Sequence, residues 1–171
     1  MVVWLIGMSG AGKTAIGKAV YKKLKTRNQS VVFLDGDSIR EVMGNDLGHT
    51  IADRRVNAGR ISRLCKYLDR QGIDVVCAVL SIFPDWQSWN REYIPQYFEV
   101  YIRVPFEILV ARETKGLYRR ALAGDINNVV GVDIDFPEPF RPDLVIDNSA
   151  QIESFDGIAD QIIESISLEI N

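Results

Sequence analysis

The N-terminal segment of this chain joins a short apolar run to a glycine-rich motif. Residues Gly7 to Thr14 read Gly-Met-Ser-Gly-Ala-Gly-Lys-Thr, which fits the pattern G-x-x-x-x-G-K-[ST]. Val2–Ile6 is apolar enough for a buried strand, and Lys13–Lys25 carries apolar residues at helical spacing. A strand, a glycine loop and a helix N-terminus form an anion site, because backbone N–H groups and the helix dipole converge there. The motif predicts a P-loop NTPase fold that binds a nucleoside triphosphate.

Each part of the motif has its own task in this interpretation. The glycines allow backbone conformations that other residues resist. Lys13 can reach the β- and γ-phosphates of ATP and neutralise them, which makes it a predicted catalytic residue, and the Thr14 hydroxyl can ligate Mg²⁺. The residues predicted to bind ATP in this segment are Gly7, Ser9, Gly10, Ala11, Gly12, Lys13, Thr14 and Ala15.

The composition is that of an ordinary globular protein. The 171 residues are 47% hydrophobic and 25% charged, which predicts a single domain over residues 1–171. A net charge of −3 argues against a general nucleic-acid or membrane surface. Cys65, Cys77 and the single histidine, His49, are too few for a metal cluster, so free thiols are expected. Because neither a signal peptide nor a membrane-spanning run is visible, we expect a cytoplasmic protein.

Apolar, β-rich segments alternate with segments of helical periodicity along the chain. The predicted strands are Val2–Ile6, Val31–Leu34, Val75–Leu80, Phe98–Val104 and Leu144–Ile146. The predicted helices are Lys13–Lys25, Ile51–Arg70, Phe106–Ala111 and Ile152–Leu168. This alternation predicts an α/β fold, a five-stranded parallel sheet with helices on both faces. Gly124–Pro142 is the one long irregular segment, and such segments are more often functional than idle.

Two carboxylates, Asp35 and Asp37, follow the second predicted strand, where ligands bind in open α/β sheets. One can accept a proton from an attacking hydroxyl while the other holds Mg²⁺ through water, so both are candidate catalytic residues. Thr14 and Asp35 are the predicted metal ligands. A turn that caps the next helix is the alternative. The strand Val75–Leu80 ends without an acid, so the usual Walker-B carboxylate is missing there.

Two groups of residues, one of arginines with an amide and one of basic residues alone, are candidates for binding further phosphate or sulfate. The first group consists of Arg40, Arg54, Asn57 and Arg60. Its last three members fall on one face of a helix and can hold an oxyanion by paired N–H bonds. The second group consists of Arg112, Lys115, Arg119 and Arg120. It lies in a predicted lid over about residues 112–135 that closes over phosphates. A solvated basic helix is the alternative in both cases.

These segments together resemble the adenylylsulfate kinases, which transfer the γ-phosphate of ATP to the 3′-hydroxyl of adenosine 5′-phosphosulfate. The similarity runs from Val3 to about Asn148. The segments that carry it, besides the phosphate loop, are Leu34-Asp35-Gly36-Asp37 with Arg40, Asp53-Arg54 with Asn57 and Arg60, Lys115-Gly116-Leu117-Tyr118, Ala123-Gly124-Asp125-Ile126 and Gly131-Val132-Asp133.

The resemblance implies roles for the matching residues. Either Asp37 or Asp35 would be the catalytic acid–base group. The residues that would hold the sulfonucleotide are Arg40, Arg54, Asn57 and Ser81. Lys115, Gly116 and Leu117 would belong to the lid beside the acceptor, and Arg112 would lie near the ATP base. The family often dimerises, so we expect that a homodimer can form.

The acceptor pocket departs from the family pattern. The family has phenylalanine where this chain has His49 and Val129, and those two rings enclose the adenine of the acceptor. Losing both removes stacking worth about 1–3 kcal/mol per base. In addition, Leu80–Pro84 replaces the family's Ile-Ser-Pro, and Gly59 replaces one of two adjacent arginines. A ring from Phe83 or from Trp86 can act as the substitute.

The sequence thus predicts an ATP- and Mg²⁺-dependent kinase that acts on a small nucleotide, with adenylylsulfate as the leading acceptor. A cytidine nucleotide such as cytidine diphosphoramidate is the alternative acceptor, because a smaller pyrimidine has less need of a two-ring sandwich. The third hypothesis is a protein that senses a nucleotide and catalyses no reaction. The intact Lys13, Thr14, Asp35 and Asp37 argue against it.

Overall fold

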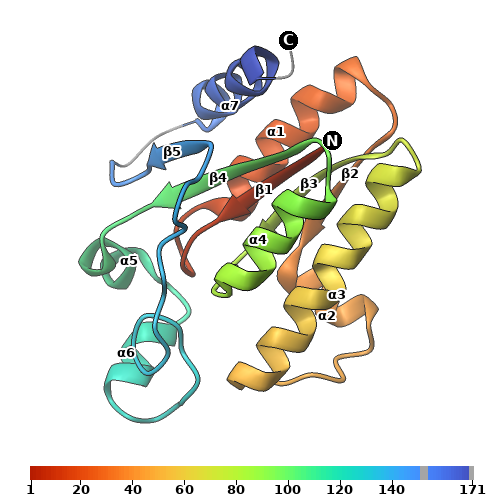
Figure 1. Cartoon of the computed structure of the whole chain (residues 1–171). Coiled ribbons are helices and arrows are strands. Elements are labelled where there is room, and N and C mark those ends of the chain that lie inside the picture. The colour runs from red at the N-terminus through yellow and green to blue at the C-terminus, as the bar shows by residue number, and fades with distance from the viewer. Residues whose placement is uncertain (151–153, 170–171) are drawn as a thin grey trace.

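The strand β1 (Val2–Ile6), which leads into the glycine-rich motif, lies in the middle of a parallel sheet in the computed structural model (Figure 1). The structure describes residues 1–150 and 154–169. Within these ranges the sheet has five strands in the order β2-β3-β1-β4-β5, and every neighbouring pair is parallel. Because β1 is paired on both edges and covered on both faces, all of its residues are buried.

The other elements follow the alternation expected from the sequence. The remaining strands are β2 (Val31–Asp35), β3 (Asp74–Val79), β4 (Tyr97–Arg103) and β5 (Leu144–Asp147). The helices are α1 (Lys13–Arg27), α2 (Gly36–Val42), α3 (Ile51–Arg70), α4 (Pro84–Tyr93), α5 (Phe106–Arg112), α6 (Leu117–Leu122) and α7 (Asp156–Glu169). None of the helices in the described ranges is long and apolar enough to cross a bilayer.

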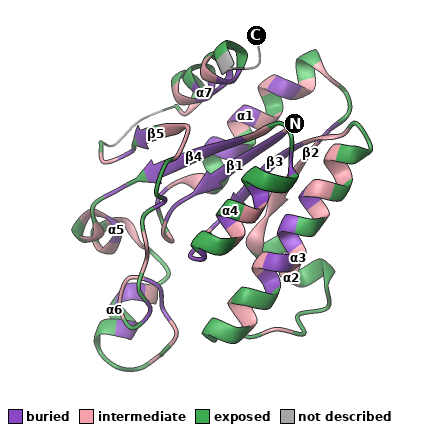
Figure 2. Ribbon diagram, viewed as in Figure 1, coloured by how far each residue is buried: buried purple, intermediate pink, exposed green. Residues whose placement is uncertain are grey.

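Helices cover both faces of the sheet, and the alternation of side chains along β1 explains how the two layers form. Val3 and Leu5 belong to a core shared with α1 and α7, which pack against each other. Val2, Trp4 and Ile6 belong to a second core beneath α3. Figure 2 shows the result as buried strands between helices whose outer faces are exposed. The glycine-rich motif, leaving β1, emerges between these two layers at the carboxyl end of the sheet.

The predicted five-stranded parallel sheet with helices on both faces is confirmed, with strand ends displaced by a residue. Three expected helices correspond to α1, α3 and α5. The expected helix Ile152–Leu168 corresponds to α7, which begins at Asp156, while residues 152 and 153 lie outside the described residues. Helices α2, α4 and α6 were not expected. The irregular segment Gly124–Pro142 holds no helix or strand, only a bridge between Val130 and Ile134.

Gly17 sets how closely α1 approaches the sheet, and its replacement tests this packing. A Cβ at Gly17 would lie 2.7 Å from Phe33 Cε2 and 2.9 Å from Leu5 Cδ1. We expect Gly17→Ala to lower the free energy of unfolding, because overpacking costs about 1–3 kcal/mol and outweighs the gain of up to ~1 kcal/mol in helix propensity. Urea unfolding measures this change in the free energy of unfolding. Gly157→Ala in α7, with open space around its Cβ, is the matched control and should be neutral or stabilising.

Candidate active site

The glycine-rich loop wraps around the first turn of α1. Gly12, the N-cap of α1, has a φ of +94°, and Gly10 has a φ of +79°, which are left-handed conformations that favour glycine. The Lys13 side chain folds back over the loop and donates a hydrogen bond from Nζ to the Met8 carbonyl at 2.7 Å. Thr14 follows in the first turn with its hydroxyl exposed. Backbone N–H groups, an ammonium and a hydroxyl are thus gathered at one helix N-terminus, as an anion site requires.

The chain after β5 supports this loop from the side. Asn148 Nδ2 donates to the Ala11 carbonyl at 2.9 Å, and a Cβ at Gly12 would lie 2.7 Å from the same nitrogen. Arg112 Nη1 donates to the Asn148 carbonyl at 2.6 Å, and its Nη2 donates to the Ser149 carbonyl. The sequence singled out Arg112 but not Asn148, whose role depends on a contact across most of the chain length.

Thr14, in the first turn of α1, and Asp35, at the end of β2, lie next to each other at the carboxyl end of the sheet. Thr14 Oγ1 donates to Asp35 Oδ2 at 2.6 Å, and Asp35 Oδ1 accepts the Asp37 N–H at 3.0 Å. Asp35 is therefore the N-cap of α2, which agrees with the capping alternative, and it also contacts the hydroxyl of the glycine-rich motif. With both oxygens engaged, Asp35 is fixed, while the carboxylate of Asp37, two residues further along the chain, accepts no hydrogen bond from the described residues.

The charge of Asp37 acts on both sides of the site. Desolvation lowers the pKa of Lys13 from 10.5 to about 8, although Asp35 and Asp37 oppose this change. Burial likewise lowers the pKa of Arg54, with Arg40 adding to the effect and Asp37 opposing it. Asp37 thus lies within electrostatic reach of the ammonium of the loop and of Arg54 in α3.

Arg40 and Arg54 surround the loop that connects α2 with α3. Arg40 Nη1 donates to the carbonyls of Leu47 at 3.3 Å and Gly48 at 2.8 Å. Arg54 Nε donates to the His49 carbonyl and its Nη2 to the Asn128 carbonyl, both at 2.8 Å. The pKa of His49 is lowered by desolvation and then by these two guanidinium groups. The site therefore concentrates positive charge next to Asp37.

The other predicted acceptor residues differ in how they are placed. Asn57 is buried, and its Oδ1 accepts no hydrogen bond from any described residue. Ser81 Oγ accepts from Trp4 Nε1 at 3.0 Å, and the backbone of Ser81 has a φ of +54°. Arg60 makes a two-bond ion pair with Asp46, with both distances 2.7 Å, so its charge is compensated outside the cluster.

The predicted lid is anchored to the glycine-rich loop. Tyr118, which is fully buried, donates from its hydroxyl to the Ser9 carbonyl at 2.8 Å. Its ring meets that of Phe106 edge-on, with centroids 5.2 Å apart. Gly116, with a φ of +71°, forms the N-cap of α6 between Lys115 and Leu117. The side of the lid next to α5 is therefore part of the folded core.

Beyond α6 the chain turns back toward the arginines. Asp133 accepts the N–H groups of Asn128 and Val129, both at 2.6 Å, which forms a tight turn. The Val129 side chain is buried in the main core. The neighbouring Asn128 carbonyl receives Arg54.

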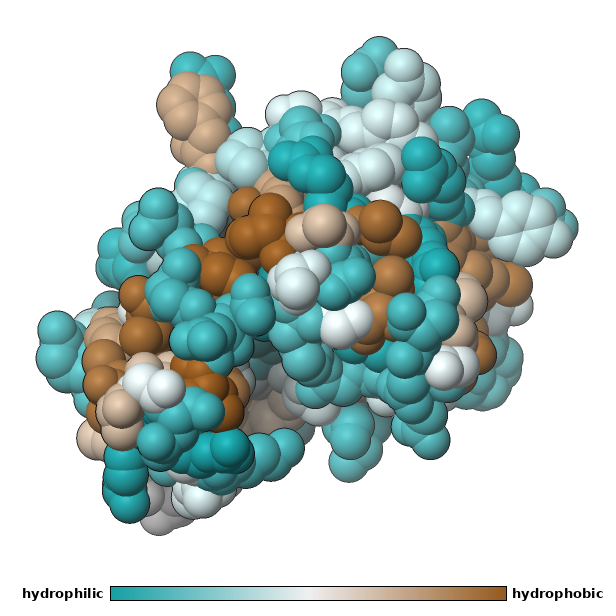
Figure 3. Space-filling model, turned by 90° about the horizontal axis from the view of Figure 1, so that it is seen from below, coloured by the Kyte–Doolittle hydropathy of each residue, from teal (hydrophilic) through white to brown (hydrophobic). Residues whose placement is uncertain are grey.

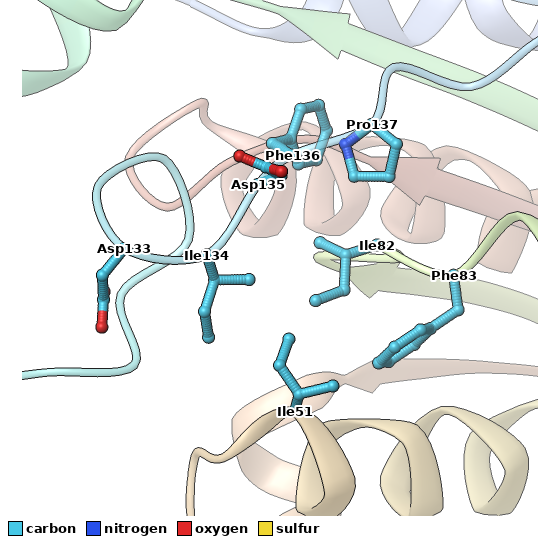
Figure 4. A pocket seen from close by; sticks show the side chains of 8 residues that line it. All are labelled: Ile51, Ile82, Phe83, Asp133, Ile134, Asp135, Phe136 and Pro137. Carbon is cyan, nitrogen blue, oxygen red and sulfur yellow. The ribbon is translucent and has the colours of Figure 1, made fainter.

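A pocket of about 720 Å³ lies beside this turn (Figure 4). The lining residues are Ile51, Ile82, Phe83, Asp133, Ile134, Asp135, Phe136 and Pro137. They come from the start of α3, from the segment after β3 and from the loop after α6, and the side chains of Ile51, Ile82, Phe83 and Ile134 face the same gap (Figure 4). Figure 3 shows the face of the molecule below α6 and α3, where hydrophobic residues form a broken band among hydrophilic ones.

Comparison with known proteins identifies the family. The sequence model described as adenylylsulphate kinase matches residues 1–147. The chain belongs to the adenylylsulphate kinase family. It is 42% identical over 156 residues to the cytidine diphosphoramidate kinase of Campylobacter jejuni, covering 88% of this chain and 87% of that protein. It is 37% identical over 146 residues to a probable adenylyl-sulfate kinase of Archaeoglobus fulgidus, covering 85% and 94%.

A solved structure agrees with this membership. The Mycobacterium tuberculosis APS kinase CysC, in complex with AMPPNP and APS, superposes with a TM-score of 0.87 at 31% identity, over 97% of this chain and 96% of that one. As a member of the adenylylsulphate kinase family, the chain is a phosphotransferase of the kind that uses an alcohol group as acceptor, and its family uses ATP.

Within the adenylylsulphate kinase family, the glycine at position 59 has a local explanation. A Cβ at Gly59 would lie 2.6 Å from Trp86 Cζ2 and 2.9 Å from Arg63 Nη1. The Trp86 ring therefore occupies the space of a side chain at position 59, and Arg63 covers the ring at 5.0 Å. Sequence reasoning found the substitution but could not pair it with Trp86, which lies in a helix that was not expected.

The lowered pKa of Lys13 makes nucleotide binding in this adenylylsulphate kinase family member sensitive to pH. We expect the phosphates to bind the protonated ammonium, so affinity should fall as the pH rises through about 8 and Lys13 loses its proton. We expect the Kd for AMPPNP to rise about tenfold between about pH 7 and about pH 9. Isothermal titration calorimetry measures this change. The Lys13→Arg variant, which stays charged, should show no such rise; an equal rise in both proteins would assign the effect to another group.

Proposed function

We propose that the protein transfers the γ-phosphate of ATP to the 3′-hydroxyl of a nucleotide, and that this acceptor is a cytidine nucleotide of the diphosphoramidate type. The observation that carries the reaction is the position of Asp37. Its charge acts on Lys13 at the donor side and on Arg54 and His49 at the acceptor side. A general base between a phosphate loop and a cationic acceptor site is what in-line phosphoryl transfer requires.

The donor half uses the glycine-rich loop. Its N–H groups and Lys13 would hold the β- and γ-phosphates, and Arg112 with Asn148 would keep the loop in place. The Thr14 hydroxyl and the Asp35 carboxylate, 2.6 Å apart, are hard oxygen ligands of the kind that Mg²⁺ prefers, so these residues fit the ion. When bound, Mg²⁺ would neutralise charge on the phosphate oxygens.

The acceptor half uses Asp37 and the arginines. Asp37 would take the proton from the attacking hydroxyl of the acceptor. The oxygen of that hydroxyl bonds to the γ-phosphorus as ADP leaves. Arg40 and Arg54 would hold the 5′ phosphate groups by paired N–H bonds. The buried Asn57, with its Oδ1 unpaired among the described residues, would accept a hydrogen bond from the acceptor. Lys115 and the lid would close over both nucleotides and exclude water.

Two features favour a cytidine acceptor. The positions that carry the family's adenine-stacking rings hold His49 and Val129, and Val129 is turned into the core. The relative that is 42% identical over 156 residues is named cytidine diphosphoramidate kinase. Adenylylsulfate, the acceptor preferred from the sequence, is the second candidate, because the chain retains Lys-Gly-Leu-Tyr and Leu-Asp-Gly-Asp and is 37% identical to a probable adenylyl-sulfate kinase.

Steady-state kinetics separate these candidates. ADP release is measured with cytidine diphosphoramidate and with adenylylsulfate at saturating MgATP. We expect kcat/KM for the cytidine compound to be at least about tenfold higher, the discrimination that ~1.4 kcal/mol provides. A preference for adenylylsulfate would overturn the choice of base and leave the reaction intact. ADP release with neither compound, by a protein that binds AMPPNP, would favour the nucleotide-sensing alternative.

A further inference from the structure

The pocket of Figure 4 adjoins the cationic acceptor site, although none of its residues was expected from the sequence to recognise a base except Phe83. Ile51 lies one helical turn before Arg54 in α3. Asp133 holds the turn whose Asn128 carbonyl receives Arg54. A nucleotide whose phosphates lie on Arg40 and Arg54 can therefore place its base in this pocket.

One wall of the pocket is an immobilised aromatic ring. Phe83 is buried, and the guanidinium carbon of Arg55 lies 4.5 Å from its ring centroid. Arg55 is fixed in turn by an ion pair with Asp85. Ile51, Ile82 and the Phe83 ring face the same gap (Figure 4). Apolar walls with one fixed ring suit a planar base, which can stack on the ring. Such stacking does not depend on base identity.

The polar groups of the pocket are two carboxylates with different capacities. Asp133 already accepts two backbone N–H groups at 2.6 Å. Asp135, on the same loop, accepts no hydrogen bond from any residue in the described ranges. An ionised carboxylate only accepts hydrogen bonds. It therefore favours a base with an exocyclic amine, as cytosine has at N4 and adenine at N6, and repels a carbonyl oxygen such as O4 of uracil.

We propose that this pocket holds the base of the acceptor nucleotide against Phe83 and that Asp135 selects bases with an exocyclic amine. The inference rests on the proposed function, since it concerns the acceptor of that reaction. It moves base recognition away from positions 49 and 129, where the family's rings lie, to Phe83 after β3 and Asp135 after the turn at Asp133. Asp135 is then a specificity-determining residue and Phe83 a base-stacking residue, and both are separate from the groups that transfer phosphate.

The test compares cytidine diphosphoramidate with uridine diphosphoramidate in the wild type and in Asp135→Asn. The asparagine amide can donate to O4 of uracil, so the substitution should lower kcat/KM for the cytidine compound about tenfold through KM and reduce the cytidine/uridine ratio by more. The KM for ATP should not change. Asp135 is exposed, so folding is not at risk. Glu164→Gln, an exposed charge loss on α7, is the matched control. An unchanged ratio in Asp135→Asn would overturn the assignment.

Phe83 is tested by two replacements. Phe83→Leu keeps an apolar side chain and should raise KM for both nucleotides about tenfold, whereas Phe83→Tyr should restore the wild-type value. Equal KM values in all three proteins would exclude Phe83 as the stacking ring. If the wild type phosphorylates neither compound, the proposed function fails. Calorimetric titration of cytidine and uridine 5′-diphosphate into the same variants then decides on the pocket: it fails if Asp135→Asn leaves the ratio of the two Kd values unchanged.

Discussion

Replacing Lys13 with alanine is expected to reduce kcat by about 10²–10³-fold while leaving the fold intact. The ammonium is the cationic side chain of the phosphate loop, and removing one preorganised donor to a developing charge has an effect of that size. The fold should survive because, within the described residues, the Lys13 side chain donates one hydrogen bond, to the carbonyl of Met8 in its own loop. ADP release in a coupled assay measures the loss, and thermal unfolding followed by circular dichroism checks the fold.

The control for this prediction is Lys18→Ala, which removes an exposed ammonium from the same helix. It should retain wild-type kcat. A folded Lys13→Ala protein with more than about half of the wild-type kcat would contradict the role of the phosphate loop in transfer.

Asp37→Asn is expected to lower kcat by about 10²–10⁴-fold with little change in the Kd for AMPPNP. The amide cannot take the proton of the acceptor hydroxyl, whereas the phosphate loop is untouched. Asp35→Asn should behave differently, because Asp35 contacts Thr14 and caps α2: we expect a higher Mg²⁺ concentration for half-maximal rate. Single-turnover rates and Mg²⁺ titrations distinguish the two variants.

Glu41→Gln, which removes an exposed carboxylate from α2, is the control for both substitutions and should be neutral. If Asp35→Asn abolishes the chemical step while Asp37→Asn affects only the Mg²⁺ requirement, the two aspartates exchange roles. If neither variant loses activity, the general base lies elsewhere.

The sheet could be predicted because its strands are nearly continuous apolar runs, as in parallel sheets buried on both faces. The helices α2 and α6 were missed because each is short and has no long apolar stripe, whereas α4 carries an aromatic stripe, Trp86, Trp89 and Tyr93, that was overlooked. Local signals existed for two of them. Pro84 stands at the N1 position of α4, and Asp35 caps α2. These signals define a helix start, whereas periodicity needs several turns to be visible.

The parts of the site that lie within one short motif could be predicted from the sequence. The parts that depend on contacts between residues far apart in the sequence could not. Helical spacing grouped Arg60 with Arg54, but spacing carries no information about Asp46, which lies in the preceding loop and binds Arg60. The support of the glycine-rich loop by Asn148 is a contact of the same kind. Likewise, only the folded chain brings Phe83 and Asp135 to one pocket.

The hydrogen bond between Tyr118 and the Ser9 carbonyl has a consequence for how nucleotides enter and leave. The bond ties the first turn of α6 to the phosphate loop, so this end of the predicted lid would act as a fixed pivot in any closure. Exchange of ADP for ATP would then require movement of the chain beyond α6. A Tyr118→Phe enzyme would lose the pivot rather than a substrate contact, and its turnover would be limited at product departure instead of phosphate transfer.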